Sequence, residues 1–390
     1  MRAILGMFAA LALLTPPAAG VPPHPTTEPS FQVDYAFPTA DKPQSKLWFA
    51  DGTWWALLPR STGPSLWERT PGGWRERPET VEALKGWPGR ADVWFGGDGV
   101  TAVGVADRQL GVMRLVRTGS TWVAAGLARL NAPASDAFET ATIARDGAGR
   151  WYIAAAVQEK LYAWSSIDAR HWSGPILLAK GLDADDIGLV TPIPGGIAVI
   201  WSNQRDDAVF IRTRGDGADA WSAATAIARG GRTADDHLHA ALGSDGTLWL
   251  ATKNSVDTDG KPQLVLRVRS ADGVWRNYPY APRTAGVEPS RPIVVALPGS
   301  NGVALGHALY ARKDHRLDQI VFGLADVSKA GVMHPTTVIA PDPRLDTRVS
   351  DPTGPKAAFP RGAAWIVLAS DAAGRVYEAD VHGALQSGPQ

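Results

Sequence analysis

One pattern of strands returns along almost the whole body of the chain. Each copy reads as a strand, a tight glycine turn and a second strand, followed by two more strands around a Gly or Asp turn that ends in tryptophan. Helical periodicity is hard to find between these runs, so the chain is predicted to be all-β. Five regular copies are followed by two less regular ones, and the seven copies begin at Leu47, Asp92, Thr140, Asp186, His237, Pro292 and Ala357.

A repeat of this length with four short strands is typical of the blade of a β-propeller. One antiparallel sheet cannot cover both of its own faces, so each blade needs a neighbour on either side. The seven copies predict seven blades of four antiparallel strands, in a single domain over residues 31–390. We expect the strand-like segment 31–37 (FQVDYAF) to complete the last blade and so remove the exposed edge.

Tryptophan is unusually frequent for a chain of 390 residues. Its 16 copies equal the 9 phenylalanines and 7 tyrosines together. A large flat side chain at the end of each outer hairpin fits the gap between blades, which widens away from the axis. We therefore expect most tryptophans to be structural.

The first twenty residues have the pattern of a signal peptide. Met1 and Arg2 precede the apolar run 4–14 (ILGMFAALALL), and small residues follow at 18–20. We expect cleavage near Gly20, a flexible proline-rich lead over residues 21–30, and a secreted or periplasmic protein. The run is short for a membrane span, and no later stretch approaches the length of a spanning helix.

Charge and cysteine content exclude several classes of function. Thirty-nine basic residues balance thirty-nine acidic ones, so no surplus positive charge favours nucleic acid. The chain has no cysteine, which excludes disulfides, thiolate metal sites and cysteine nucleophiles. No glycine-rich phosphate loop or Ser nucleophile elbow is present. We predict no cofactor and no metal, because the acidic groups at 183–186 and 257–260 lack the pattern of a calcium loop.

Two outer-hairpin turns carry a family resemblance. Residues 166–172 (SIDARHW) and 270–275 (SADGVW) resemble the Asp-box, or BNR repeat, of the sialidase superfamily, and weaker versions occur at 214–221, 118–122 and 70–74. Residues 235–381 are also similar to secreted sialidase-like propellers without an established activity. The resemblance implies the propeller fold. It implies no catalytic assignment, because the Asp-box of that family is structural and lies away from its catalytic face.

Polar residues flank the strands at one end of the predicted disc. In an up-and-down blade the innermost strand starts, and the second strand ends, on the same face, so these residues are expected to surround the axis. His237, Asp236 and Lys253 form the candidate catalytic group, with an aspartate to orient the histidine. The candidate ligand-binding residues are Glu139, Asp186, Asn203, Arg205, Asp235, Asn254, Arg291, His307 and Tyr310. Plain lining of the channel is the alternative for all of them, and His239 is expected to be a buried structural histidine.

The residue types of this group favour an anionic glycan as ligand. Lysine and arginine would hold a sugar carboxylate, and a carboxylate or histidine would transfer protons. If the protein is an enzyme, it is expected to be a glycoside hydrolase or a polysaccharide lyase. A true sialidase is disfavoured, because no Arg-Ile-Pro motif is found near the first blade and Tyr310 has no partner identifiable from sequence. A non-catalytic propeller that binds a protein partner is the alternative function.

Overall fold

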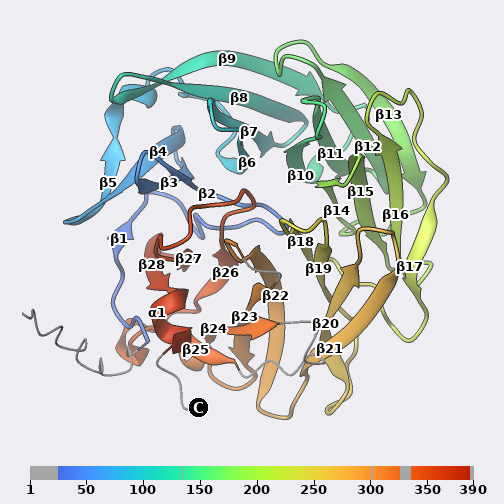
Figure 1. Cartoon of the computed structure of the whole chain (residues 1–390). Coiled ribbons are helices and arrows are strands. Elements are labelled where there is room, and N and C mark those ends of the chain that lie inside the picture. The colour runs from blue at the N-terminus through green and yellow to red at the C-terminus, as the bar shows by residue number, and fades with distance from the viewer. Residues whose placement is uncertain (1–24, 134, 300–301, 326–334, 387–390) are drawn as a thin grey trace, which may run out of the picture.

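Seven four-stranded antiparallel sheets surround one axis, as the view in Figure 1 shows. The computed structural model describes residues 25–386 except 134, 300–301 and 326–334. Within this part of the chain the sheets follow one another in sequence order. The predicted all-β propeller of seven blades with four antiparallel strands is therefore confirmed.

Each blade contributes one strand to each of four concentric layers. The innermost strands are β2 (Leu47–Ala50), β6 (Arg90–Phe95), β10 (Phe138–Arg145), β14 (Gly188–Ile193), β18 (Leu238–Leu242), β22 (Val287–Ala296) and β26 (Ser350–Thr353). The second strands are β3 (Thr53–Arg60), β7 (Gly99–Ala106), β11 (Trp151–Val157), β15 (Gly196–Asn203), β19 (Leu248–Lys253), β23 (Val303–Ala311) and β27 (Ile366–Ser370). The third strands are β4 (Gly63–Thr70), β8 (Gln109–Thr118), β12 (Lys160–Ser166), β16 (Ala208–Gly215), β20 (Pro262–Arg269), β24 (Gln319–Ala325) and β28 (Arg375–Asp380). The outermost strands are β5 (Gly73–Arg77), β9 (Thr121–Asn131), β13 (Ser173–Lys180), β17 (Thr225–Arg229), β21 (Trp275–Pro282), β25 (Thr336–Ile339) and β1 (Phe31–Gln32).

The first strand of the chain closes the ring. β1 pairs antiparallel with β28, and Phe31 lies opposite Val376. The Phe31 ring lies 4.6 Å from the ring of Trp67 in the first blade, so closure also joins blade seven to blade one. The pairing covers two residues, which is shorter than the predicted segment 31–37. The seventh repeat also differs from prediction. Its innermost strand is β26, and the predicted start at Ala357 lies in the long connection 354–365 between β26 and β27.

The short helix α1 (Val381–Gln386) follows the last strand, and single 3₁₀ turns lie at Pro78–Thr80, His315–Leu317 and Pro343–Leu345. Among the described residues, no helix has the length and apolar character needed to cross a membrane. The expected signal peptide, residues 1–20, lies outside the described residues. Within the expected lead, Thr26 forms a parallel bridge to Ile339 at the outer edge of blade six.

Tryptophans at the outer hairpins lie between neighbouring blades, as predicted. Trp122 of blade two is fully buried, and its ring lies 5.7 Å from that of Trp48 and 5.5 Å from that of Trp55, both in blade one. The corresponding Trp221 of blade four packs edge-on to Tyr152 of blade three. At 166–172 the Asp168 carboxylate accepts the backbone N–H groups of Arg170 and His171, which holds the turn.

Hydrogen bonds from side chain to backbone connect the innermost strands around the hub. The Asp92 carboxylate accepts the Ile143 N–H at 2.8 Å, from blade two to blade three. The Thr142 hydroxyl accepts the Val190 N–H at 2.9 Å, and His239 Nδ1 accepts the Val294 N–H at 3.2 Å. His239 is therefore a structural residue of the hub, as expected from the sequence.

We expect Thr142→Val to lower the free energy of unfolding by about 1–3 kcal/mol. The substitution keeps the shape of the side chain but leaves the buried Val190 N–H without an acceptor. Denaturant unfolding measures the change, with Thr225→Val on the exposed outer strand β17 as the matched control. Equal losses in both variants would mean that the hub bond contributes nothing.

The axis itself is filled by the segment 39–46, which connects β1 to β2. Gln44 donates to the Ala141 carbonyl of blade three, Lys42 pairs with Asp236 of blade five, and Thr39 bonds to Ser370 of blade seven. A cavity of about 20 Å³ remains beside this segment, which is room for about one water molecule. The axis beside this segment has no room for a ligand larger than water, so a larger binding cavity must lie to one side of it, over the blades.

Candidate functional site

The cavity that collects most of the predicted catalytic group lies over blades five and six. Its volume is about 470 Å³. His237 immediately precedes β18 and Lys253 ends β19, so the antiparallel hairpin brings both to the same end of blade five. The cavity is lined by His237, Lys253, Glu288, Ser290, Arg291, Tyr310, Ala311, Arg312 and Arg348. The site is therefore lateral to the axis, because segment 39–46 fills the central position.

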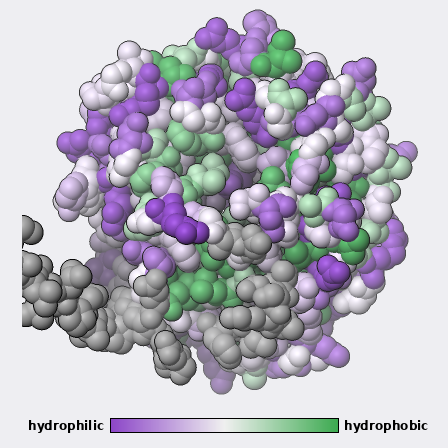
Figure 2. All heavy atoms as spheres, in the orientation of Figure 1, coloured by the Kyte–Doolittle hydropathy of each residue, from purple (hydrophilic) through white to green (hydrophobic). Residues whose placement is uncertain are grey.

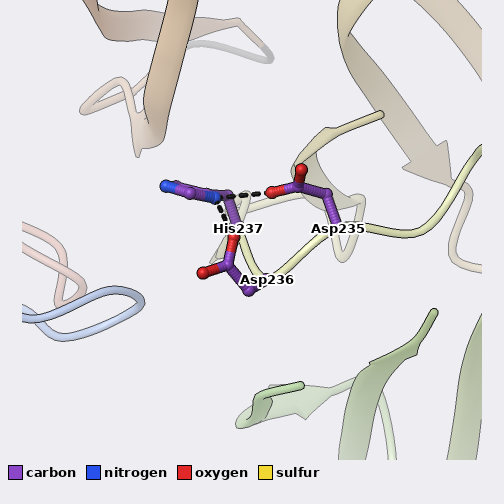
Figure 3. A group of neighbouring side chains, drawn as sticks. All are labelled: Asp235, Asp236 and His237. Atoms are coloured by element: carbon purple, nitrogen blue, oxygen red, sulfur yellow. Dashed lines mark hydrogen bonds and ion pairs between the residues drawn. The ribbon is translucent and has the colours of Figure 1, made fainter. Parts of the chain in front are cut away.

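His237 is held by two carboxylates through one ring nitrogen. Its Nδ1 lies 2.6 Å from Asp235 Oδ1 and 2.5 Å from Asp236 Oδ1. Figure 3 shows both carboxyl groups on the Nδ1 side of the ring, with the other ring nitrogen directed away from them. Nδ1–H therefore donates to the carboxylates, and Nε2 keeps its lone pair, with Ser290 Oγ 3.4 Å away.

Burial keeps this imidazole neutral. Burial lowers the pKa of His237 to about 3, Lys42 and Arg291 act in the same direction, and Asp235 opposes them. The side chain is 7% exposed, and His237 lines the cavity. At neutral pH the imidazole is therefore neutral, and the lone pair of Nε2 is free to act on a bound molecule. The lowered pKa makes the ring a weaker base than an exposed histidine, so its position in the cavity, and not its pKa, makes it the candidate general base.

Lysines balance the two carboxylates behind the histidine. Lys253 Nζ lies 3.3 Å from Asp235 Oδ2, and Lys42 pairs with Asp236. Although burial acts to raise it, the pKa of Asp235 lies well below its ordinary value, because His237 and Lys253 stabilise the charged form. Asp235 is thus held as an anion, and Asp236 is anchored by its ion pair with Lys42, so both side chains orient the imidazole.

Asp235, Asp236 and His237 could also hold a metal ion. One ligand atom from each lies within 4.8 Å of the others. The remaining carboxylate oxygens, however, already face the ammonium groups of Lys42 and Lys253. We therefore assign the two aspartates to orienting His237, and the absence of a metal stays a prediction.

Arg291 and Asp351 occupy matching positions in neighbouring blades. Each lies between a serine and a proline, at a bulge of the innermost strand, with a left-handed backbone (φ 53° and 50°). This conformation is uncommon outside glycine and tends to occur at functional sites. The Arg291 Nε lies 3.3 Å from Asp351 Oδ1 and 3.4 Å from the Tyr310 hydroxyl, so the two bulges bring these groups together.

Tyr310 has partners that the sequence did not reveal. Its hydroxyl lies 2.6 Å from Ser350 Oγ, and the Arg348 guanidinium lies 4.6 Å from its ring centre. Burial raises the pKa of Tyr310, so its hydroxyl stays protonated at neutral pH. Glu288 is directly opposite Tyr310 in the register of β22 and β23, but its carboxylate bonds Arg283 at 2.8 Å.

Five lining residues or close neighbours were missed by the sequence reasoning: Lys42, Glu288, Arg312, Arg348 and Asp351. Glu288 precedes the predicted repeat start, and Arg312 follows the second strand by one residue, so blade boundaries set a little wider would have included both. Lys42 and Arg348 lie in connections outside the repeat pattern. Only the folded chain brings them to the site.

The other predicted ligand-binding residues lie elsewhere. Asp186 accepts the Asp183 and Gln204 N–H groups, Asn203 holds the turn at Asp206, and Arg205 pairs with Glu159 at 3.0 Å on the exposed edge. Glu139 lies beside the axis, where burial raises its pKa. Asn254 donates to the Pro262 carbonyl, and His307 is buried within blade six against Tyr280. The structure thus brings together His237, Asp235, Asp236, Lys253, Arg291 and Tyr310.

Comparison with solved structures supports the fold. The polysaccharide lyase Uly1 gives a TM-score of 0.50 at 10% identity, covering 89% of this chain and 92% of that one. A protein from Lactobacillus plantarum gives 0.52 at 12% identity, covering 77% and 86%. An α-L-arabinanase from Penicillium chrysogenum, complexed with arabinobiose, gives 0.46 at 11% identity, covering 78% and 99%. At these identities the likeness to the first two structures shows the fold alone. Neither models of protein families nor curated protein sequences give a match.

Proposed function

We propose that the protein binds an anionic glycan in the cavity over blades five and six and cleaves it by β-elimination. The observation that carries the proposal is the charge of the wall. Four cations, Lys253, Arg291, Arg312 and Arg348, line the cavity with a single carboxylate, that of Glu288. The carboxylates of Asp235, Asp351 and Asp318, which pair with Lys253, Arg291 and Arg348, are buried or nearly so. Asp259, which pairs with Arg312, is exposed and does not line the cavity. Four cations and one carboxylate therefore line the cavity, which suits a sugar carboxylate.

The geometry of His237 supports elimination as the reaction. In this reaction the Nε2 atom removes the proton on the carbon next to the uronate carboxylate. The electron pair forms a carbon–carbon double bond as the glycosidic bond to the neighbouring sugar breaks. The leaving oxygen takes a proton, for which the Tyr310 hydroxyl is suitably protonated. Arg291 and Lys253 would neutralise the carboxylate and so stabilise the negative charge that develops on it.

Hydrolysis of a sugar acid is the second candidate reaction at the same site. Ordinary glycoside hydrolysis uses two carboxyl groups across the scissile bond, and among the described lining residues only Glu288 has one. A tyrosine nucleophile is the other route. Arg291 and Arg348 contact Tyr310, and Arg312 lines the same cavity, which favours this route. Glu288 lies opposite in register but is bonded to Arg283 rather than to the tyrosine hydroxyl.

The products distinguish the two reactions. β-Elimination leaves a sugar with a double bond conjugated to the carboxylate, which absorbs ultraviolet light, whereas hydrolysis adds water and leaves no such group. We would incubate the protein with a panel of uronate polymers and sialylated oligosaccharides. Unsaturated products support the proposal. Saturated products would show that the reaction is hydrolysis and not elimination. If the protein binds no anionic glycan in the panel, the proposed function is wrong.

Arg291→Ala is expected to weaken binding of a uronate oligosaccharide about tenfold to a hundredfold. The loss corresponds to one charge-assisted hydrogen bond with the sugar carboxylate. Isothermal titration calorimetry measures the dissociation constant. Arg205→Ala is the matched control, because Arg205 is exposed on blade four and pairs with Glu159. Equal affinities of the two variants would contradict the assignment of Arg291.

We further propose, from the sequence features, that the protein is exported and related to the sialidase-like propellers. The alternative role as a protein-binding platform has one supporting observation. Val123 and Leu127 of β9 and Ile176 and Leu177 of β13 expose apolar side chains on the outer strands of neighbouring blades. These residues are separate from the cationic cavity. A protein partner that binds there should therefore bind the Arg291→Ala variant as tightly as the parent protein.

A further inference from the structure

A second cavity lies at the opposite end of the propeller from the cationic one. Its volume is about 620 Å³, and it is formed by the first hairpin tips of blades one and two and by residues 358–360 of blade seven. These tips join the end of each innermost strand to the start of the second, whereas His237 and Lys253 lie where the innermost strand begins and the second ends. The two cavities are therefore independent sites.

Aromatic rings form the wall of this second cavity. Phe49, Phe95 and Phe359 line it, and Phe49 and Phe95 are partly exposed. The ring of Trp54 lies 5.4 Å from that of Phe49 and 5.2 Å from that of Phe359, so the wall is supported from behind and is rigid. Figure 2 shows apolar surface near the centre of the face in view, over the first blade.

The polar groups of the second cavity are charge-balanced. Asp51 Oδ2 lies 2.9 Å from Arg117 Nε, and Asp98 Oδ2 lies 2.7 Å from Arg114 Nη2. The Arg117 guanidinium also lies over the rings of Trp55 and Trp122, at 5.2 and 5.4 Å from their centres, which fixes its position. Asp51 and Asp98 keep carboxylate oxygens toward solvent, with side chains 55% and 64% exposed.

We infer that this second cavity binds an uncharged saccharide. A ligand here meets phenyl rings on one side and fixed acceptors and a fixed donor at the rim, without net charge. A neutral sugar ring matches both, because its C–H face packs on aromatic rings and its hydroxyls hydrogen-bond to carboxylates and a guanidinium. The carboxylates of Asp51 and Asp98 would repel an anionic sugar, which the cationic cavity at the other end of the propeller would bind instead. The inference does not depend on the reaction proposed for the cationic cavity.

Titration with neutral oligosaccharides tests the second site. We would use gluco-, galacto-, xylo- and arabino-oligosaccharides at up to millimolar concentrations, with binding followed by calorimetry and by ligand-observed NMR. The parent protein is expected to bind at least one of them. The double variant Asp51→Ala, Asp98→Ala is expected to weaken that binding at least about tenfold, since it removes both exposed acceptors. Phe95→Ala is expected to weaken it by a similar factor through lost ring contact.

Variants at the cationic cavity are the matched controls. Arg291→Ala and Lys253→Ala should leave the neutral oligosaccharide bound with unchanged affinity. If the parent protein binds none of the neutral oligosaccharides, the inference is wrong. It is also wrong if the double variant Asp51→Ala, Asp98→Ala binds them as tightly as the parent protein. Loss of neutral binding in Arg291→Ala would place the sugar at the other end. The Asp98 side chain is exposed, so its loss should leave folding intact. Asp51 has a left-handed backbone (φ 51°), which alanine adopts at a cost. Circular dichroism and denaturant unfolding check the double variant, and Asp98→Ala alone, expected to weaken binding by a smaller factor, is the second variant.

Discussion

His237→Gln is expected to lower the turnover of a uronate polymer by about a hundredfold to ten-thousandfold, which is the range for loss of a positioned general base. Glutamine can still donate its amide N–H to the carboxylates of Asp235 and Asp236 but has no basic nitrogen for the cavity. The affinity for a uronate oligosaccharide should therefore change little. The appearance of unsaturated product, followed by its ultraviolet absorbance, gives the rate, and calorimetry gives the affinity.

Asp236→Asn separates positioning from proton transfer. It keeps an acceptor for Nδ1–H but removes the charge that pairs with Lys42, so we expect a smaller loss of turnover than in His237→Gln. Unchanged turnover in His237→Gln would exclude the histidine as base, and Tyr310 would take its place as the group to test. A variant that loses binding and turnover together would assign His237 to ligand contact instead.

The blade repeat could be predicted because it depends on local features. Glycine turns, alternating strands and the outer-hairpin tryptophans recur within each copy, and Trp122 lies between blades one and two as expected. The seventh blade was misplaced at Ala357 because its innermost strand, Ser350–Thr353, is short and interrupted by the bulge at Asp351. β26 pairs with β27 at only two positions, so this strand leaves little alternating pattern in the sequence.

The candidate site was predictable only where it follows from blade geometry. Asp235, His237 and Lys253 share one hairpin, so strand direction alone brings them together. The filled axis was not predictable, because segment 39–46 has no repeat partner and its contacts reach blades two, three, five and seven. This segment moves the site sideways, which explains why Glu139, Asp186 and Asn203 lie outside the cavity although they occupy corresponding positions in their blades.

The protein is expected to unfold steeply on acidification, beginning below about pH 6. His237, His239 and His307 are buried, and burial lowers the pKa of each to about 3. In the unfolded chain each takes up a proton near pH 6.5, while the native state stays unprotonated, so the unfolded state binds more protons. The free energy of unfolding then falls by about 1.4 kcal/mol per histidine and pH unit, or about 4 kcal/mol per unit in total.

Buried carboxyl groups oppose this fall at lower pH. Burial raises the pKa of Glu139, Asp186 and Asp318, so the native state takes up protons there first. The pKa of Asp235 is lowered by His237 and Lys253, so Asp235 acts in the opposite direction and adds to the loss below about pH 4. The contribution of the histidines is therefore read between pH 6 and 5. Denaturant unfolding at a series of pH values gives the slope. His307→Phe should reduce it by about a third, because one titrating group is removed from the buried set. Equal slopes in the parent and in His307→Phe would show that His307 is protonated in the native state.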